Sequence, residues 1–380
     1  MKILIDLRCL LNNSFGGIQK YAEEFIKNIL DIDKKNEYIL FENSLTGSKK
    51  HFKNTKIVNF NIPNKIFDSL AKLGLIGSID KLVKADLIYS PHFNYLKVSN
   101  AKRIITIHDL SFIHYPSFFN LKQNLWHKFQ NIKSQADVSE IVITNSEFTK
   151  QDIVNILKIP KEKIKVIYPG ISDDLKPISE NDPSLISFKQ KYKINYPFLL
   201  YLGTIEPRKN INSIIKSFNL LKKDNKFSEL KLILAGNKGW LYKNIENEAK
   251  KSEYRKDIIF WGRVLEEEKI FLYNLCECFI YPSFFEGFGF PPLEAEKCGA
   301  PTIVSDRASL KETNPNAPKI NPWKPEELKE AIGNVLEDKN YREELRRLGI
   351  QNAKKFSWRL SAIKLIEIFE TYGSKTKNTN

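Results

Sequence analysis

The sequence predicts an α/β protein with two parallel sheets that helices cover on both faces. Three observations lead to this fold class. Short apolar runs alternate with amphipathic helical stretches along the chain, a pattern typical of parallel sheets. A stretch rich in Pro, Asp, Ser and Lys, near residues 172–195, separates two such series. The length of 380 residues is too great for one ordinary core and suits two domains.

The first series predicts an N-terminal domain at residues 1–175. Its clearest helical patterns are at residues 19–30 and 149–157. Its apolar runs predict strands at residues 2–5, 38–41, 56–60, 87–89, 103–107, 140–144 and 165–167.

The second series predicts a C-terminal domain at residues 195–357, followed by an amphipathic helix and a polar tail at 358–380. The expected strands are 198–202, 231–235, 258–261, 278–281 and 301–304. The expected helices are 211–222, 240–250, 266–275, 292–298, 325–337 and 358–372.

Composition narrows the class of protein. Hydrophobic residues make up 42% and charged residues 28% of the chain, a normal globular balance. The net charge of +15 is shared by both halves, since residues 1–175 hold 25 Lys and Arg against 18 Asp and Glu. Basic surfaces on both domains suit phosphates, anionic substrates or an anionic membrane face. The charge is not gathered in a tail or interleaved with exposed aromatics, so nucleic acid is not an expected partner.

Cysteine use and hydropathy predict a cytoplasmic protein, soluble or peripheral on the inner face of a membrane. The four cysteines form no C-x-x-C pair and are expected to be reduced and mostly buried. The N-terminal run enters a strand directly and lacks a signal-peptide layout. No apolar stretch reaches the roughly 18 residues that a membrane-spanning helix needs.

The most informative segment is residues 281–294, which read Tyr-Pro-Ser-Phe-Phe-Glu-Gly-Phe-Gly-Phe-Pro-Pro-Leu-Glu. The strand before them and the prolines near the start of the next helix place Glu286 on a loop and Glu294 in the first helical turns. Gly287 and Gly289 lack a Cβ, so loop amides can approach a ligand closely. Two carboxylates beside amide donors suit a polyhydroxylated ligand. Two surface glutamates on a glycine-rich turn are the alternative, which leaves the Gly-Phe-Gly-Phe-Pro-Pro between them unexplained.

A second segment, Gly203-Thr-Ile-Glu-Pro-Arg-Lys-Asn, predicts an anion site. It follows a strand and precedes a helix, and a helix N-terminus with two cations attracts phosphate. Arg208 can fork onto phosphate oxygens, and Lys209 can act as a point charge. Taken alone, the same residues fit a solvated loop equally well.

Two weaker signals lie in the first half. Gly16 and Gly17 open the helix after the first strand and can cradle a phosphate, although most glycine pairs are simple turns. His108 stands at the carboxyl end of a buried strand, where ligands of open α/β sheets sit. Asp109 is expected to orient its ring. A structural His is the alternative.

The spacing of Glu286 and Glu294 resembles the signature of retaining glycosyltransferases of family 4, which have the GT-B fold. The resemblance extends over nearly the whole chain. It implies two Rossmann-like domains with parallel sheets facing a central cleft, and a C-terminal helix that returns to the first domain. It implies that Glu294 holds the ribose of a sugar nucleotide and that Glu286 lies near the donor sugar. The loop amides that would bind sugar hydroxyls are those of Gly287, Phe288, Gly289 and Phe290.

The resemblance also implies a role for each residue that the sequence alone indicates only weakly. Lys209 matches a lysine that neutralises the donor diphosphate in the loop that begins at Gly203. The family's arginine directly follows that glycine, where this chain has Thr204, so Arg208 is expected to substitute from four positions later. The glycine pair is expected at the diphosphate and His108 at the donor sugar.

Further matches lie at strand ends. Asn145 and Ser146 match a segment that faces the cleft, with helix capping as the main expected role. Arg263 and Val264 match the loop beside the nucleotide base.

Together these features predict a retaining hexosyltransferase that needs no metal and no cofactor. The Gly-Thr-Ile-Glu-Pro-Arg-Lys-Asn variant most resembles the polysaccharide mannosyltransferases of the family, and this resemblance implies GDP-mannose as the donor and a cell-surface glycan or lipid-linked acceptor. A UDP-hexose-dependent transferase and a non-catalytic nucleotide-sugar-binding protein are the alternatives. The aromatic and basic stretch at residues 112–129 is expected mostly to pack in the core, with contact to membrane or a lipid-linked acceptor as the alternative.

Overall fold

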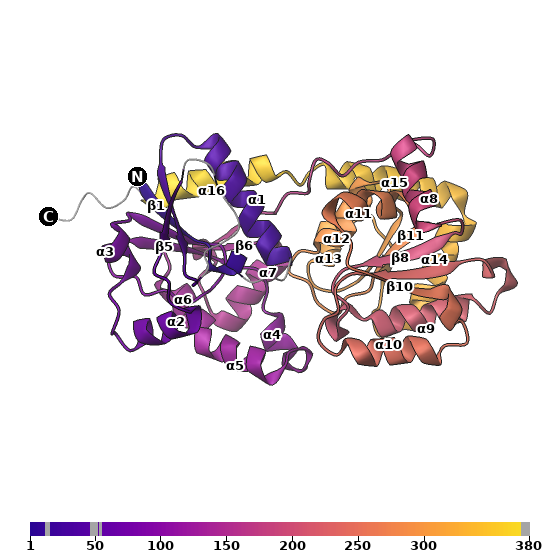
Figure 1. Cartoon of the computed structure of the whole chain (residues 1–380), viewed down its shortest axis with the longest axis horizontal. Coiled ribbons are helices and arrows are strands. Elements are labelled where there is room, and N and C mark those ends of the chain that lie inside the picture. Colours follow the sequence, from indigo (N-terminus) through magenta and orange to yellow (C-terminus); the bar gives the residue numbers. More distant parts are fainter. Residues whose placement is uncertain (12–15, 46–51, 53–54, 374–380) are drawn as a thin grey trace. The chain divides into compact units, whose positions relative to one another are not determined.

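The structure is a computed structural model that describes residues 1–11, 16–45, 52 and 55–373. By their contacts these residues divide into two compact units, each built around one sheet (Figure 1). Unit 1 comprises residues 1–112, 121–170 and the C-terminal segment from Ser357. Unit 2 comprises residues 113–120 and 171–356. Each unit is described by itself.

The sheet of unit 1 has seven parallel strands in the order β3-β2-β1-β4-β5-β6-β7. The interior strands are mostly apolar because helices cover them on both faces, and β4 and β6 are entirely buried. The strands are β1 (Lys2–Asp6), β2 (Glu37–Glu42), β3 (Lys56–Asn59), β4 (Leu87–Ser90), β5 (Lys102–Ile107), β6 (Ile141–Thr144) and β7 (Ile164–Val166).

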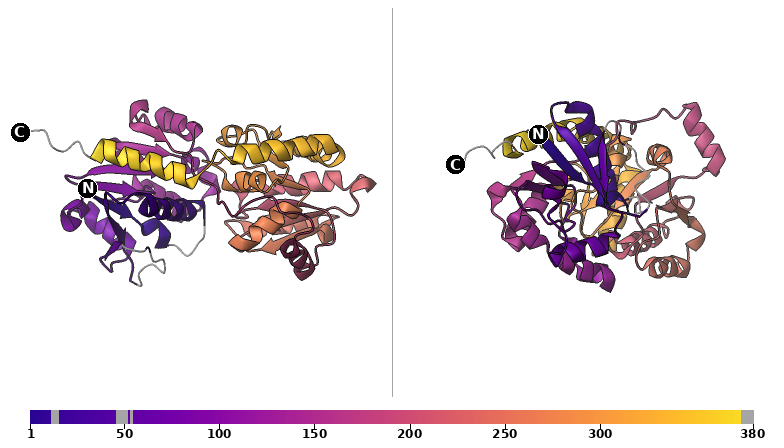
Figure 2. Two further views of the ribbon diagram at one scale, coloured as in Figure 1. Left: turned by 90° about the horizontal axis from the view of Figure 1, so that it is seen from above. Right: turned by 60° about the vertical axis from the view of Figure 1, so that its left-hand side comes forward.

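The helices of unit 1 include the C-terminal helix α16, which lies beside α1 (Figure 2). The rings of Tyr21 and Phe25 on α1 pack against Trp358, the first residue of α16. The helices are η1 (Arg8–Leu11), α1 (Gly17–Ile32), α2 (Asn64–Lys72), α3 (Ile79–Val83), α4 (Ser111–His114, which ends in unit 2), α5 (Leu121–Gln130), α6 (Ile132–Val138), α7 (Glu147–Asp152), the π-helical turn η3 (Ile153–Leu157), η4 (Lys161–Lys163) and α16 (Trp358–Gly373).

The sheet of unit 2 has six parallel strands in the order β10-β9-β8-β11-β12-β13. Its order changes direction between β8 and β11, and ligands of open α/β sheets bind beside such a point, beyond the carboxyl ends of the strands. The strands are β8 (Phe198–Leu202), β9 (Lys231–Ala235), β10 (Ile258–Gly262), β11 (Cys278–Tyr281), β12 (Thr302–Ser305) and β13 (Lys319–Ile320).

Among the helices of ten or more residues in unit 2, two were not predicted from the sequence. The stretch near residues 172–195, expected to be the linker, contains α8, which Asp182 caps by accepting from the Ser184 N–H at 2.8 Å. The second is α15. The helices are η2 (Pro116–Phe118), α8 (Pro183–Tyr192), η5 (Pro207–Lys209), α9 (Ile211–Leu221), η6 (Asn225–Phe227), α10 (Tyr242–Lys251), η7 (Arg255–Asp257), α11 (Glu266–Leu275), α12 (Phe290–Lys297), α13 (Leu310–Thr313), α14 (Pro325–Glu337) and α15 (Lys339–Ala353).

Candidate active site

The two informative segments of the sequence meet at the switch point of the unit 2 sheet. One follows β8 and the other follows β11, and these two strands are neighbours. The Phe284 N–H donates to the carbonyl oxygen of Arg208 at 3.0 Å, which joins the two loops directly. Residues that lie 77 positions apart in the sequence are therefore brought together at the carboxyl edge of the sheet.

Arg208 and Lys209 both bind Glu286. Lys209 Nζ donates to Glu286 Oε1 at 2.5 Å, and Arg208 Nη1 donates to Glu286 Oε2 at 3.2 Å. Lys209 Nζ also donates to the Tyr281 hydroxyl at 2.8 Å, and Arg208 Nη2 donates to Glu206 Oε1 at 3.1 Å. Arg208 thus lies at the same carboxylate as Lys209, and its substitution for the arginine missing at Thr204 stays a prediction.

The ion pair is buried, and the two cations set the protonation of Glu286. Burial by itself would raise the pKa of Glu286, but the charges of Lys209 and Arg208 outweigh it and lower this pKa to about 2. Glu286 is therefore ionised at any physiological pH. Because both of its oxygens accept hydrogen bonds from cations, it is a weak nucleophile and a strong anchor for the two cations.

The glycine loop after Glu286 is fixed by a neighbouring helix. Ser309 Oγ donates to the Glu286 carbonyl at 2.8 Å, and Thr313 Oγ1 donates to the Phe288 carbonyl at 3.1 Å. Gly289 caps α12 with φ of 88°, and a Cβ there would lie 2.7 Å from Leu310 Cδ2. Only glycine suits this position, because a side chain would be strained by both backbone and contact.

Glu294 lies in the same unit, within α12, and is only 1% exposed. The Tyr273 hydroxyl donates to Glu294 Oε2 at 3.0 Å, and Lys269 Nζ is 3.6 Å from the same oxygen. Both partners belong to α11. A buried carboxylate that already has a hydroxyl donor and a nearby cation is a fixed acceptor.

The other predicted residues of unit 2 lie on adjacent loops of the same sheet edge. The Gly203 N–H donates to Ala235 O at 3.0 Å, and the Gly236 N–H donates to Gly262 O at 2.7 Å, which ties the loops after β8, β9 and β10 together. Arg263 and Val264 follow β10, an edge strand two positions from β8. Arg263 is exposed and Val264 half-buried. These two residues are thus on the predicted edge, whereas no described contact joins them to Glu286.

In unit 1, His108 has both ring nitrogens engaged. Its Nε2 donates to Pro91 O at 2.8 Å, and its Nδ1 accepts from Asn145 Nδ2 at 2.9 Å. Burial lowers the pKa of His108 to about 4, so the ring is neutral at pH 7 with its proton on Nε2. The expectation that Asp109 orients this ring is wrong, because Asp109 Oδ1 accepts from the backbone N–H and the hydroxyl of Ser111.

The remaining residues predicted in unit 1 lie at helix starts or strand ends. Asn145 follows β6 and orients His108. Ser146 caps α7, its hydroxyl accepting from the Thr149 N–H at 3.1 Å. Gly16 is the N-cap of α1 and Gly17 its first residue, while residues 12–15 before them lie outside the described part of the chain.

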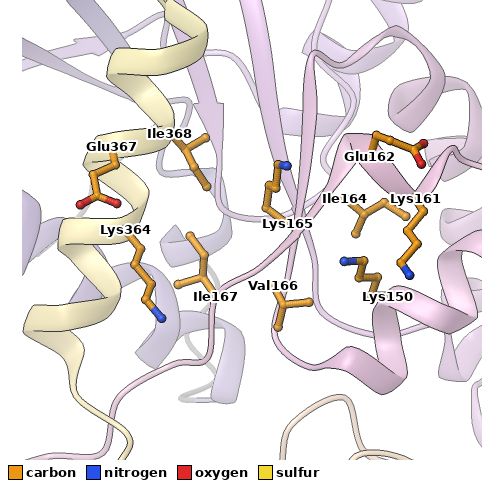
Figure 3. Close-up of a pocket in the computed structure, with 10 residues that line it drawn as sticks. All are labelled: Lys150, Lys161, Glu162, Ile164, Lys165, Val166, Ile167, Lys364, Glu367 and Ile368. Atoms are coloured by element: carbon orange, nitrogen blue, oxygen red, sulfur yellow. The ribbon is translucent and has the colours of Figure 1, made fainter.

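A polar groove of about 660 Å³ lies elsewhere on unit 1, along β7 (Figure 3). Lys150, Lys161, Lys165 and Lys364 line it with Glu162 and Glu367. β7 is an edge strand. Of the four lysines only Lys165 is on β7, where a lysine discourages pairing of the edge strand with another chain.

The part of the chain that the structure describes contains neither a cluster of metal ligands nor a membrane-spanning helix. There, no group of three or more His, Cys, Asp or Glu residues is arranged to hold a metal ion. No helix in the same ranges combines the length and the apolar character needed to cross a bilayer.

Comparison with known proteins assigns the family. Residues 15–175 match Glycosyltransferase Family 4, and residues 184–356 match Glycosyl transferases group 1. The O-antigen chain mannosyltransferase B of Escherichia coli is 31% identical over 280 residues, which cover 72% of this chain and 71% of that protein. The chain belongs to glycosyltransferase family 4. It is therefore an enzyme of the retaining hexosyltransferase class.

Solved structures agree on the fold of this family 4 member, which is GT-B. The sucrose-phosphate synthase of Thermosynechococcus elongatus superposes with a TM-score of 0.78 at 17% identity, covering 97% of this chain and 98% of that one. HepE of Anabaena, in complex with UDP and glucose, superposes with a TM-score of 0.74 at 19% identity, covering 98% and 100%.

Several residues around the family 4 motif were missed by sequence reasoning. Tyr281 was visible only as the end of an apolar strand, and Tyr273 and Lys269 only as members of an amphipathic helix. Ser309 is the N-cap of α13 and Thr313 its last residue, and the four residues of this helix are too few to show a period. The contacts of these residues depend on which strands and helices are neighbours, which the sequence alone does not show.

Proposed function

We propose that this glycosyltransferase moves a mannosyl group from GDP-mannose, with retention at the anomeric carbon, to a cell-surface glycan or lipid-linked acceptor. The observation that carries the proposal is the buried set of Arg208, Lys209 and Glu286 at the switch point of the unit 2 sheet. Two cations held beside a helix start suit a diphosphate. Similarity to an O-antigen chain mannosyltransferase supports mannose and a glycan acceptor.

The diphosphate would bind where Arg208 and Lys209 now face Glu286. In the reaction the bond between the anomeric carbon and the diphosphate oxygen breaks, and a bond to the acceptor oxygen forms on the same face. The departing diphosphate takes up the acceptor proton. Its charge grows as the bond breaks, so the two cations stabilise the transition state more than the ground state.

Glu286 would hold the cations in place and would not attack the sugar. Its two oxygens accept from Lys209 and Arg208, and its pKa of about 2 makes it a poor nucleophile. Glu294 would accept from a ribose hydroxyl, because it is a buried carboxylate on the adjoining helix. The backbone of residues 287–290 would bind sugar hydroxyls, and the base would lie near Arg263 and Val264.

The residues predicted in unit 1 complete the proposal. His108 would contact the donor sugar as a neutral ring, and Gly16 and Gly17 would lie at the diphosphate. Asn145 would act through His108, and Ser146 mainly through its cap on α7. The reaction would need no metal ion, and the enzyme would work in the cytoplasm, peripheral to the membrane.

A nucleotide panel tests the proposal. Thermal unfolding is followed with GDP, UDP, GDP-mannose and UDP-glucose, because a ligand that binds the native state raises the melting temperature by mass action. The proposal expects the largest shift with the guanosine compounds and release of GDP from GDP-mannose. A shift confined to UDP compounds would favour the UDP-hexose alternative, which the likeness in fold to the UDP-bound HepE supports. Binding without any donor turnover, with or without added glycan, would favour the non-catalytic binding protein.

A further inference from the structure

Unit 1 carries an apolar surface that no described part of the chain covers. It lies on α5, on α2 and on the turn that follows α2. Its most exposed members are Leu121 (75%), Leu73 (73%) and Leu75 (70%). We call it the leucine-lysine face, and its apolar members are Ile66, Leu73, Leu75, Leu121, Leu125 and Phe129.

Helix α5 is apolar on two sides. Its inner side supplies Trp126, which packs on the buried cluster around Phe93, and the buried Gln130. Its outer side bears Leu121, Leu125 and Phe129, each one turn after the last. At 3.6 residues per turn these three side chains span about 80° of the helix surface, away from Gln130. A surface helix that had only to cover a core would be polar on this outer side.

Helix α2 continues the same surface. Lys72, its last residue, donates through Nζ to the carbonyl of Phe129, and its Nζ lies 3.5 Å from the centroid of the Phe129 ring. Leu73 follows Lys72 directly, and Leu75 comes two residues later. The two helices lie side by side at the lower edge of unit 1 (Figure 1).

The exposed charges of the leucine-lysine face are all positive. Residues 121–133 contain three lysines and no acidic residue. Lys122 and Lys128 are exposed and flank the leucine stripe on its two sides. Lys65 and Lys72 of α2 are also exposed, and because they are seven residues apart they lie on one side of that helix. The acidic residue of α2, Asp68, is buried and paired with Arg8 at 2.7 Å.

We propose that the leucine-lysine face docks this enzyme on an anionic lipid bilayer. Leucine and phenylalanine side chains would enter the boundary between headgroups and acyl chains, while the lysines reach anionic headgroups with their long stems. A second copy of the chain is a poor occupant, because a two-fold contact would set the lysines of both copies against each other without any acidic partner. An acidic protein partner would pair with the lysines, but its charged surface would leave the exposed leucines without apolar contact.

The test is co-sedimentation of the full chain with vesicles of phosphatidylcholine alone or with one third phosphatidylglycerol, across a salt series. We expect binding to the anionic vesicles only, weakened by salt. The variant K122Q/K128Q should bind them roughly 20-fold more weakly, since each lysine near the surface contributes about fivefold. The variant L121Q/L125Q should bind the anionic vesicles at least roughly tenfold more weakly, because two apolar side chains no longer enter the bilayer.

Matched controls separate the face from general properties of the protein. K243Q/K251Q removes the same charge from exposed lysines of α10, and I186Q/L360Q removes two exposed aliphatic side chains from α8 and α16. Both controls should bind like the parent, and every variant should keep the parent's melting temperature and GDP affinity. Equal losses in the face and control variants would overturn the proposal, as would no binding to anionic vesicles. A dimer that L121Q/L125Q dissociates would assign the face to a second copy instead.

Discussion

Lys209 and Glu286 form a buried ion pair, with Lys209 Nζ 2.5 Å from Glu286 Oε1 and each side chain less than 10% exposed. Such a pair contributes little net stability, because desolvation of the two charges offsets their attraction. Removing one partner is costly, because the other charge stays buried. A pair of this kind is well suited to hold a cation ready for an incoming diphosphate.

The first prediction separates stability from binding at this pair. We expect Lys209→Ala to destabilise unit 2 by about 1–3 kcal/mol, since Arg208 still neutralises Glu286 in part, and to weaken nucleotide binding. The double variant K209A/E286A should recover part of the stability but none of the affinity, because both charges have gone. Urea unfolding and GDP or UDP titration on both variants provide the measurement. Normal nucleotide affinity in Lys209→Ala would place the diphosphate elsewhere.

The second prediction concerns Glu294. We expect Glu294→Gln to weaken nucleotide binding roughly 10- to 150-fold, as for loss of a charged acceptor to a ribose hydroxyl. The melting temperature without ligand should change little, since the Tyr273 hydroxyl can still donate to the amide oxygen. Glu267→Gln on α11 is the control, because Glu267 is exposed and loses the same charge. Titration calorimetry with GDP and UDP decides, and equal affinities in parent and Glu294→Gln would remove Glu294 from the site.

The fold could be predicted because parallel strands buried on both faces appear in the sequence as short apolar runs. Helices α8 and α15 could not, for two different reasons. α8 lies in a polar stretch whose Asp182 and Pro183 are capping signals that composition concealed. In α15 only Leu345, Gly349, Asn352 and Ala353 of 15 residues are buried, so its apolar period is weak.

The residues of the candidate site could be singled out from the sequence, but the contacts between them could not. Arg208, Lys209 and Glu286 were each singled out, yet their mutual binding depends on β8 lying beside β11. The pattern of apolar residues in the sequence identifies the strands, but it does not show which strands are neighbours in the sheet. The hydrogen bond from Asn145 to His108 could not be predicted for the same reason, because it forms only if β5 and β6 are neighbouring strands.

The third prediction concerns His108. We expect His108→Ala to leave GDP or UDP affinity nearly unchanged and to lower donor turnover sharply, because its proposed contact is to the donor sugar, whereas the charged phosphate contacts and the ribose contact proposed above lie in unit 2. The parent should show no ionisation of His108 between pH 5 and 8, because burial lowers its pKa to about 4. Initial rates across this range, paired with nucleotide titration, test both statements. Parental turnover in His108→Ala would remove this residue from the sugar site.

The last prediction concerns Glu296, a buried carboxylate of α12 outside the proposed chemistry. Asn314 Nδ2 and Asn352 Nδ2 donate to its two oxygens at 2.9 and 2.8 Å. Burial nevertheless raises its pKa from the ordinary 4.5 to about 7. Between these values the unfolded chain loses a proton that the native state keeps, so native stability falls as pH rises.

We therefore expect this group to lower the free energy of unfolding by up to about 3 kcal/mol between pH 4.5 and 7, and to add no slope above that. Glu296→Gln should lose one of the two amide hydrogen bonds, at about 1 kcal/mol, but should lack that slope. Urea unfolding from pH 4.5 to 7.5 measures both proteins below the range of Lys319, whose pKa burial lowers to about 8. Parallel curves for parent and variant would show that Glu296 is ionised throughout, held so by the two asparagines.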